Sequence, residues 1–503
     1  MSLPQKRTVL FLTVCCLLFC PVLYSQKTVK SVQDYFEDIR NNEAELTAFI
    51  SQMPKGADLH NHYSGAIYAE SYVDWLTEAG YCINPQTLQT FSGKSGCPQD
   101  YSKLADLKSN SPSYYETIRN NLIRYWSAKD YDQIHTLSRE DQFFTAFGKF
   151  GAASGMNYDK GLVELKNRAK KENVSYIELM FSSIWMPDSA KNNPFISNAD
   201  TLKFYNNLFA KLNKSRDSAG TFALLKSLYP RIYNKVPVNT SAALFNSYID
   251  SLHTNFVGED PSFTMRYLTY VSRINDPLIT FINMMIAFEA IQYSQNSGNK
   301  KGLLRGVNIL APEDNSNSMQ NYWLHMQFFS FCNKQYKGII PYTMHAGELT
   351  EGVVPPEELT WHISSAVRSA GAKRIGHGVD IAYEKDNYGL LNYMRANSIA
   401  VEINLSSNEF ILGVKDDKHP ILLYKHFGVP IVISTDDAGI SRSSLTEQYV
   451  LLAKRYKEIS YADIKQFVYN SIKYSFIDVA KKETLRLDLD NRFTTFETYI
   501  TNR

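Results

Sequence analysis

The chain has 503 residues, of which 44% are hydrophobic, and it carries 53 lysine and arginine residues against 51 aspartate and glutamate residues. A chain of this length can bury a large core, and a single barrel with insertions can exceed 400 residues. The balanced charge excludes the surplus of positive side chains that nucleic acids and anionic membrane surfaces require, so we expect a small-molecule partner.

The first 25 residues have the layout of a secretory signal peptide. Lys6 and Arg7 precede an apolar run from Val9 to Phe19, and the small Ser25 stands before Gln26. We therefore expect an exported protein, periplasmic or secreted, whose mature chain has no integral membrane span. An uncleaved anchor is the alternative. Removal of this segment leaves 51 positive and 51 negative side chains.

Three of the six cysteines, Cys82, Cys97 and Cys332, lie beyond the signal peptide. Export favours a disulfide between Cys82 and Cys97, which bracket a loop rich in glycine and serine. Cys332 stands in an apolar, helix-like stretch, so we expect a buried free thiol.

Apolar runs and helical patterns alternate along the chain. A helix over 26–52 precedes the barrel domain at 53–503, and a mainly helical insertion at about 64–173, interrupted by a loop from Asn84 to Gln99, follows the first strand. Extra helices follow the second strand. Eight strands are predicted, at 56–62, 174–181, 263–271, 303–310, 338–344, 374–377, 399–405 and 430–435. Eight alternations of strand and helix predict a (β/α)8 TIM barrel.

Polar side chains gather where these strands end. His60 and His62 are two residues apart in the first strand, so both rings point to one face. His345 ends the fifth strand and Glu348 follows in the loop; taken alone, this pair could be a core histidine and a surface glutamate. Later strand ends add three more such residues, His377, Asp436 and Asp437. The active site of such a barrel lies at the carboxyl ends of its strands, where all of these residues fall.

These motifs together resemble the adenosine deaminases of the amidohydrolase superfamily. They are Met-Pro-Lys-Gly-Ala-Asp-Leu-His-Asn-His ending at His62, His-Ala-Gly-Glu ending at Glu348, Gly-His-Gly around His377, and Ser-Thr-Asp-Asp ending at Asp437. The Met-Pro-Lys-Gly opening and the signal peptide look most like the secreted, growth-factor-type branch. The resemblance covers roughly residues 53–460.

The resemblance implies one Zn²⁺ ion per chain, held by His60, His62, His345 and Asp436. Imidazoles with one carboxylate suit zinc, which lowers the pKa of a bound water from ~15.7 towards ~7. It further implies that Glu348 protonates purine N1, that His377 orients or deprotonates the water, and that Asp437 contacts N7. His377 could instead be a supporting group, and Asp437 could cap the following helix.

Two positions depart from the family pattern. Ala311 stands where the family has a glycine whose backbone N–H meets purine N3, and its methyl group narrows the approach. Ser64 replaces an aspartate that grips the ribose 5′-hydroxyl, unless a residue from the insertion takes over that role. The remaining histidines are expected to be surface or packing residues: His253, His325, His362, His419 and His426.

The leading interpretation is hydrolytic deamination of adenosine or 2′-deoxyadenosine. The alternatives are deamination of another 6-aminopurine nucleoside, 5′-modified or AMP-like, and a non-catalytic nucleoside-binding or signalling protein. A positioned proton donor such as Glu348 argues for an enzyme. The oligomeric state stays open.

Overall fold

The structure, a computed structural model, describes residues 31–134, 137–188, 193–296 and 302–502. The predicted signal peptide therefore lies outside the described residues. The pattern over 26–52 predicts one helix, but the structure has two, α1 (Val32–Ile39) and α2 (Glu43–Gln52). The break occurs because the side chain of Asn42 accepts a hydrogen bond from the backbone N–H of Glu45 and so caps a new helix.

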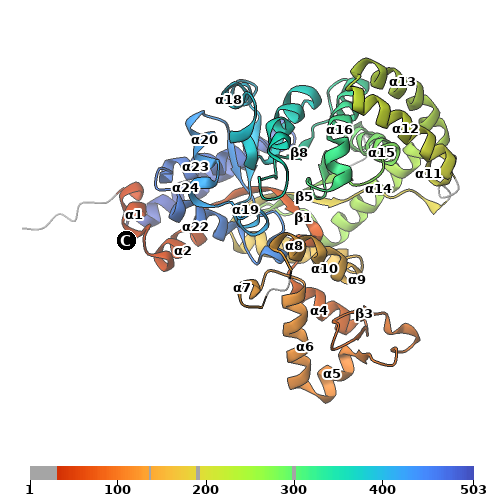
Figure 1. Cartoon of the computed structure of the whole chain (residues 1–503). Helices are drawn as coiled ribbons and strands as arrows, with labels where there is room; N and C mark the ends of the chain where they lie inside the picture. The colour runs from red at the N-terminus through yellow and green to blue at the C-terminus, as the bar shows by residue number, and fades with distance from the viewer. Residues whose placement is uncertain (1–30, 135–136, 189–192, 297–301, 503) are drawn as a thin grey trace, which may run out of the picture.

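Eight parallel strands in the described part of the chain form a barrel (Figure 1). They pair as two sheets of four, in the orders β1-β5-β6-β7 and β8-β9-β10-β11. Single parallel bridges, Val307 with Tyr342 and Asn61 with Asp436, join the two sheets at both edges. The predicted barrel is confirmed, with strands β1 (Gly56–His62), β5 (Val174–Ser182), β6 (Thr264–Ser272), β7 (Leu304–Leu310), β8 (Thr343–Ala346), β9 (Arg374–His377), β10 (Ala400–Ile403) and β11 (Ile431–Ile433).

Helices surround the barrel. α15 (Pro277–Asn296) is apolar around most of its circumference because α14 (Val238–Leu252), α16 (Ser316–Gln335) and β7 all pack against it. The extra helices predicted after the second strand include α12 (Ala199–Ser215) and α13 (Ser218–Lys235), which lie at the outer edge in Figure 1. The later strands alternate with α18 (Asn387–Ala396), α19 (Leu405–Leu412), α20 (Ile421–His426), α22 (Leu445–Arg455) and α23 (Tyr461–Lys473).

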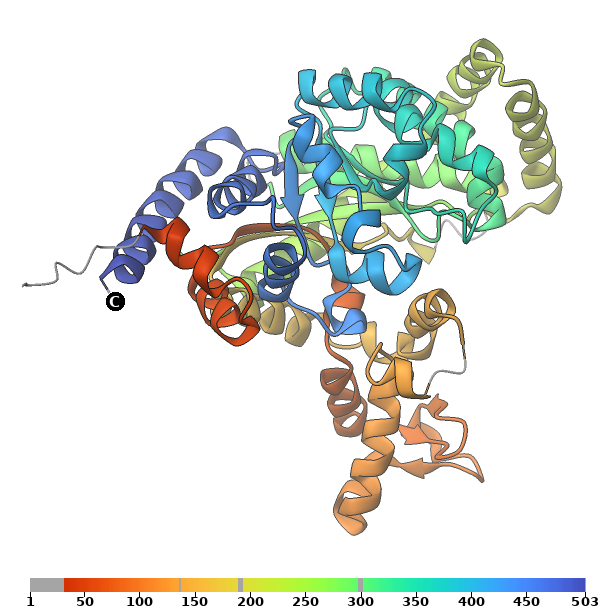
Figure 2. The ribbon, with the colours of Figure 1, turned by 60° about the vertical axis from the view of Figure 1, so that its left-hand side comes forward.

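Residues 69–125 of the insertion between β1 and β5 form a lobe that projects from the barrel (Figures 1 and 2). The stretch from Asn84 to Gln99 is more than a loop, because it contributes β3 (Thr90–Phe91) to a small antiparallel sheet with β2 (Cys82–Ile83) and β4 (Ser102–Lys103). Strands of two residues carry no periodicity that a sequence pattern could reveal. The disulfide between Cys82 and Cys97 is present, as predicted. The helices of the insertion include α4 (Ala69–Glu78), α5 (Leu104–Asn110), α6 (Pro112–Tyr125), α8 (Arg139–Lys149) and α10 (Tyr158–Lys171).

The two ends of the described chain meet on one side of the barrel. The long final helix α24 (Val479–Thr501) packs against α1 and α23 (Figure 2). Next to them, the buried Lys55 ammonium donates to the backbone carbonyls of Met53 and Glu172 at 3.1 and 2.9 Å, which ties the ends of α2 and α10 together. Cys332 is a buried free thiol, as predicted. Within the described ranges, no helix combines the length and apolar character that crossing a membrane requires.

Candidate active site

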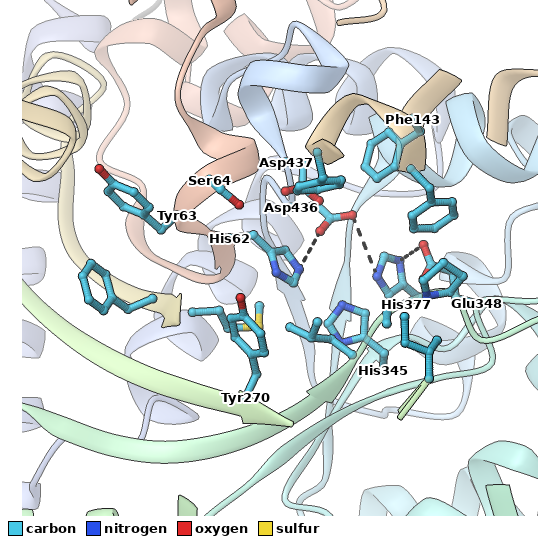
Figure 3. Close-up of a pocket in the computed structure, with 18 residues that line it drawn as sticks. His62, Tyr63, Ser64, Phe143, Tyr270, His345, Glu348, His377, Asp436 and Asp437 are labelled. Atoms are coloured by element: carbon cyan, nitrogen blue, oxygen red, sulfur yellow. Dashed lines mark ion pairs between the residues drawn. The ribbon is translucent and has the colours of Figure 1, made fainter. Parts of the chain in front are cut away.

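A cavity of about 370 Å³ opens at the carboxyl ends of the barrel strands (Figure 3). Its volume falls within the range of small-molecule sites. Eight of the predicted site residues line it: His62, Ser64, Ala311, His345, Glu348, His377, Asp436 and Asp437. The ninth, His60, is fully buried, and its ring centroid is 5.2 Å from that of His62. The fold therefore brings together every site residue that the sequence predicted.

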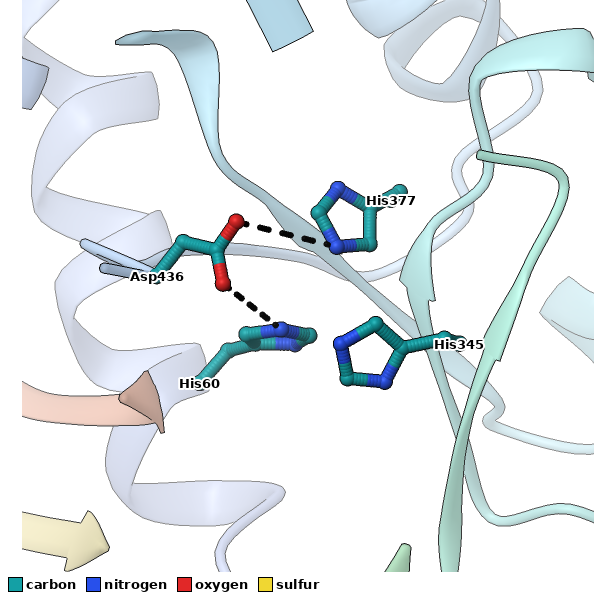
Figure 4. Close-up of side chains that lie close together, drawn as sticks. All are labelled: His60, His345, His377 and Asp436. Atoms are coloured by element: carbon teal, nitrogen blue, oxygen red, sulfur yellow. Dashed lines mark ion pairs between the residues drawn. The ribbon is translucent and has the colours of Figure 1, made fainter. Parts of the chain in front are cut away.

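Imidazoles and one carboxylate form a compact cluster at the base of the cavity (Figure 4). Ligand atoms of His60, His345, His377 and Asp436 all lie within 4.8 Å of one another. His62 joins them, with Nε2 at 3.1 Å from Asp436 Oδ1 and 3.3 Å from His60 Nε2. Distance alone therefore does not separate the predicted ligand His62 from His377.

The electrostatics of this cluster fit a cation. Burial opposes a charge on His60, yet the carboxylates of Asp436 and Glu402 raise the pKa of its imidazole to about 10, so the site stabilises positive charge. Burial and the neighbouring rings, His60 first, push the pKa of His345 well below its usual value and keep that ring neutral. Neutral imidazoles beside an ionised carboxylate are a donor set that zinc accepts.

A buried ionic network, which the sequence did not reveal, holds His60 in place. Glu402 Oε2 lies 2.7 Å from His60 Nδ1, and Arg374 Nε donates to Glu402 Oε1 at 2.5 Å. Arg374 also pairs with Glu178 at 2.7 Å. A hydrogen bond of this kind fixes the tautomer and orientation of a metal-ligating histidine. Single charged residues inside the otherwise apolar strands β5 and β10 were the available signal.

Glu313, also missed from the sequence, clamps the turn after β8. Its carboxylate accepts hydrogen bonds from the backbone N–H groups of Gly347 and Glu348 at 3.2 and 3.1 Å. His362 Nδ1 lies 2.6 Å from the same carboxylate, and Arg273 pairs with it at 3.5 Å. His362, expected to be a surface or packing residue, thus belongs to the support of Glu348.

Glu348 and Asp437 are buried carboxyl groups whose surroundings favour the protonated form. Burial first, and then the charge of Asp436, raises the pKa of both well above the usual range. The side chain of Asp437 faces the cavity and makes no capping hydrogen bond to α21 (Ala438–Ser441). Gly65 leaves the necessary space, because a Cβ atom there would stand 1.6 Å from Asp437 Oδ1.

The backbone is strained at three of the site residues. Ala311, His377 and Asp436 have φ angles of +90°, +68° and +57°. Such conformations cost a non-glycine residue about 1–3 kcal/mol and persist where the surroundings over-determine them, most often at functional sites. At Ala311 this explains why a glycine would suit the position, as the family pattern suggests.

Comparisons with known proteins agree with this site. Residues 311–492 match the family model described as adenosine deaminase. An adenosine deaminase from Clostridium perfringens is 31% identical over 148 residues, which cover 29% of this chain and 41% of the relative. The match thus spans less than half the length of that curated relative.

Solved structures extend the likeness to the whole barrel. An N6-methyl-AMP deaminase from Arabidopsis thaliana superposes with a TM-score of 0.52 at 16% identity, covering 88% of this chain and 98% of its own. An amidohydrolase from Burkholderia ambifaria with bound zinc gives a TM-score of 0.50 at 17% identity, with coverages of 91% and 95%. These structures establish the shared fold, and the match to the adenosine deaminase family model is confined to residues 311–492.

Proposed function

We propose that this protein is a zinc-dependent hydrolase that deaminates a neutral 6-aminopurine nucleoside, adenosine or 2′-deoxyadenosine, to the inosine product and ammonia. One observation carries the proposal. A carboxyl group that holds its proton, Glu348, faces the same cavity as a buried cluster of imidazoles and one carboxylate. Hydrolytic deamination needs both a proton donor for the purine and an activated water molecule.

Each group in the cavity has a role in this chemistry. Zn²⁺ held by His60, His62, His345 and Asp436 would supply a water molecule activated for attack. Glu348 donates its proton to purine N1 while the water oxygen bonds to C6. One of the two water protons then restores Glu348, and the other passes to the amino group as the bond from C6 to nitrogen breaks and ammonia leaves. His377 orients the water. Asp437, protonated, donates a hydrogen bond to N7, and the backbone N–H of Ala311 faces N3.

The charges around the cavity favour a nucleoside over a nucleotide. Among the described residues that line it there are three carboxyl groups, Glu348, Asp436 and Asp437, but no lysine or arginine. Phosphate sites in proteins use such cations or helix amino termini. A 5′-monophosphate would therefore enter without a partner, although the superposed Arabidopsis enzyme acts on an AMP derivative.

Among its described residues, the insertion gives the cavity lining no substitute for the missing ribose carboxylate. Besides Tyr63 and Ser64, it contributes three phenylalanines of α8 to the lining: Phe143, Phe144 and Phe147. None of these can accept a charge-assisted hydrogen bond from a 5′-hydroxyl. This supports Ser64 as the group nearest in chemistry to the usual aspartate, and with it a tolerance for change at the 5′ position.

We further propose that the protein is exported and resembles the secreted branch of the family. The disulfide between Cys82 and Cys97 supports this, because such bonds persist in oxidising compartments. Amino-terminal sequencing of the mature protein from its natural host tests it. A start near residue 26 is the expected result, and an intact Met1 would contradict cleavage.

The function is tested by ultraviolet assay of zinc-reconstituted protein on adenosine, 2′-deoxyadenosine, AMP and N6-methyl-AMP. We expect turnover of the two nucleosides, stoichiometric zinc by elemental analysis, and loss of turnover when a chelator removes the metal. Higher kcat/KM for either nucleotide would assign an AMP-type deaminase instead. Tight nucleoside binding without turnover in the zinc-loaded protein would indicate a binding protein.

A further inference from the structure

Behind the cavity, the side-chain amide of Asn408 lies between two buried imidazoles. One of its terminal atoms is 2.9 Å from His377 Nδ1, and the other is 2.9 Å from His419 Nε2. Asn408 belongs to α19, and His419 precedes α20. All three side chains are almost completely buried, so their hydrogen bonds must be met within the protein.

One backbone donor determines which atoms of these three side chains donate and which accept hydrogen bonds. The backbone N–H of Ile421 donates to His419 Nδ1 at 3.2 Å. Burial, followed by the charge of Arg455, lowers the pKa of His419 to about 3, so the ring is neutral and carries one proton. Because Nδ1 accepts, that proton is on Nε2 and must be donated to Asn408.

An asparagine side chain can accept only through its oxygen. The oxygen of Asn408 therefore faces His419, and its NH₂ group faces His377 Nδ1. In this orientation the side-chain amide of Asn408 is turned by about 180° from the one in which Oδ1 lies toward His377. The turn exchanges Oδ1 and Nδ2, two atoms of nearly equal size. The opposite orientation would direct two donors, the amide and the N–H of Ile421, at a ring with one lone pair.

We propose that Asn408 and His419 are positioning residues that hold His377 in the tautomer with its proton on Nε2. Glu348 Oε1 is 3.6 Å from His377 Nδ1, which is beyond hydrogen-bond distance. On the cavity side, His377 Nε2 has no hydrogen-bond partner among the described residues, and Asp436 Oδ2 is 3.9 Å from it. An oxygen atom between these two groups would receive the Nε2 proton.

This tautomer separates the roles of the clustered rings. Glu402 accepts a hydrogen bond from the Nδ1–H of His60, which leaves the Nε2 lone pair of that ring free for a cation. His377 has the opposite arrangement and so has no lone pair to offer on the cavity side. In the proposed reaction, His377 with this tautomer donates a hydrogen bond to the attacking water and does not deprotonate it. The effect of the tautomer on turnover therefore rests on the proposed function.

The first test reads the tautomer directly and does not require activity. Long-range ¹H–¹⁵N correlation spectra of zinc-reconstituted, histidine-labelled protein distinguish protonated from unprotonated ring nitrogens, and His377→Gln assigns the signal. We expect protonated Nε2 in the wild type. In Asn408→Asp, whose carboxylate only accepts, the proton should move to Nδ1. A wild-type ring protonated on Nδ1 would overturn the proposal.

The second test measures turnover. Asn408→Asp should lower kcat by at least ~10²-fold, the usual size of a lost proton-transfer or orienting group, with zinc content and KM little changed. Asn246→Asp, a buried asparagine on α14, controls for the cost of a new buried carboxylate. His419→Phe removes the donor to the Asn408 oxygen, so kcat should fall in this variant as well, and a wild-type kcat there would overturn the positioning role even if Asn408→Asp does not fold.

The outcomes separate this inference from the proposed function. If the wild type deaminates no purine but shows the Nε2 tautomer, the proposed function fails and the positioning role stands. If the wild type is active while Asn408→Asp keeps the wild-type kcat, the positioning role fails.

Discussion

Glu402 and His60 are fully buried, and the carboxylate Oε2 of one lies 2.7 Å from Nδ1 of the other. Burial opposes ionisation of Glu402, but Arg374 and His60 lower its pKa to about 2, so the carboxylate is charged at every physiological pH. A charged acceptor at Nδ1 fixes the ring proton there and makes Nε2 the atom that faces the cluster.

We expect Glu402→Gln to weaken zinc binding by about 10–100-fold, as losses of such outer partners usually do. The amide cannot hold the Nδ1 proton as firmly, and Arg374 loses one of its two carboxylates. Chelator competition measures the affinity. Glu289→Gln, which removes a partly buried carboxylate bonded to Tyr336 far from the cavity, is the control. Equal zinc affinity in the Glu402 variant and the wild type would refute the orienting role.

Glu348→Gln should reduce kcat by at least ~10²-fold while zinc remains bound, because glutamine is nearly isosteric but has no proton to deliver to N1. Steady-state kinetics with metal analysis of the same sample provides the measurement. Considerable turnover with full zinc content would mean that the proton comes from another group.

Glu313→Gln should lower kcat and leave zinc bound. Glutamine can accept through one oxygen only, so the backbone N–H of either Gly347 or Glu348 loses its partner, and hydrogen bonds to charged groups are worth about 1.5–3 kcal/mol. Hydrogen exchange at these two amides should accelerate.

The control for Glu313→Gln is Lys55→Met at the opposite end of the barrel. It removes buried hydrogen bonds to Met53 and Glu172, so it should reduce the melting temperature without changing kcat. If both variants show the same ratio of lost activity to lost melting temperature, then Glu313→Gln lowers turnover only by destabilising the protein.

Glu140 on α8 predicts a pH dependence of stability. Burial, and then a hydrogen bond to Asp314 in the loop after β7, raises its pKa from 4.5 to about 7. The folded state therefore binds more protons than the unfolded chain between these values, and the free energy of unfolding falls as the pH rises through this range. Below pH 4.5 the contribution of this carboxyl pair to the free energy of unfolding is fully present.

Melting temperatures between pH 4 and 8 test this pH dependence. Glu140→Gln should remove the decline in melting temperature, so the melting temperature of the variant should increase relative to that of the wild type as the pH rises. Glu116→Gln makes the same charge change at an exposed position of α6 and should follow the wild type. Parallel curves for all three proteins would exclude the carboxyl pair as the cause.

Discrimination at the 5′ position should be weak. Ser64 is neutral, so loss of the 5′-hydroxyl leaves no buried charge unpaired, whereas a site built around such a partner rejects the analogue strongly. We expect kcat/KM for 5′-deoxyadenosine to lie within ~10²-fold of that for adenosine. A larger ratio would reveal another strong partner for the hydroxyl.

The barrel could be predicted because each strand is a short apolar run and its polar residues stand at the end that the fold directs to the cavity. His60, His345 and Asp436 were found in this way. The supporting groups were missed for the opposite reason: Glu402, Glu313 and His419 have no motif of their own. They gain meaning only from contacts between distant strands, which a periodicity cannot show. The two-residue strands of the insertion were missed because they are too short to carry a pattern.

The closure of the barrel sets the order in which the site can form. The backbone N–H of Asp436 donates to the carbonyl of His60 at 2.8 Å, so the first and last strands meet at the cluster itself. A ribosome must therefore have released almost the whole chain before these two groups can face the same ion. If the chain crosses a membrane unfolded, it acquires zinc only after translocation, and the metal supply of the destination compartment, not of the cytosol, sets the fraction of active enzyme.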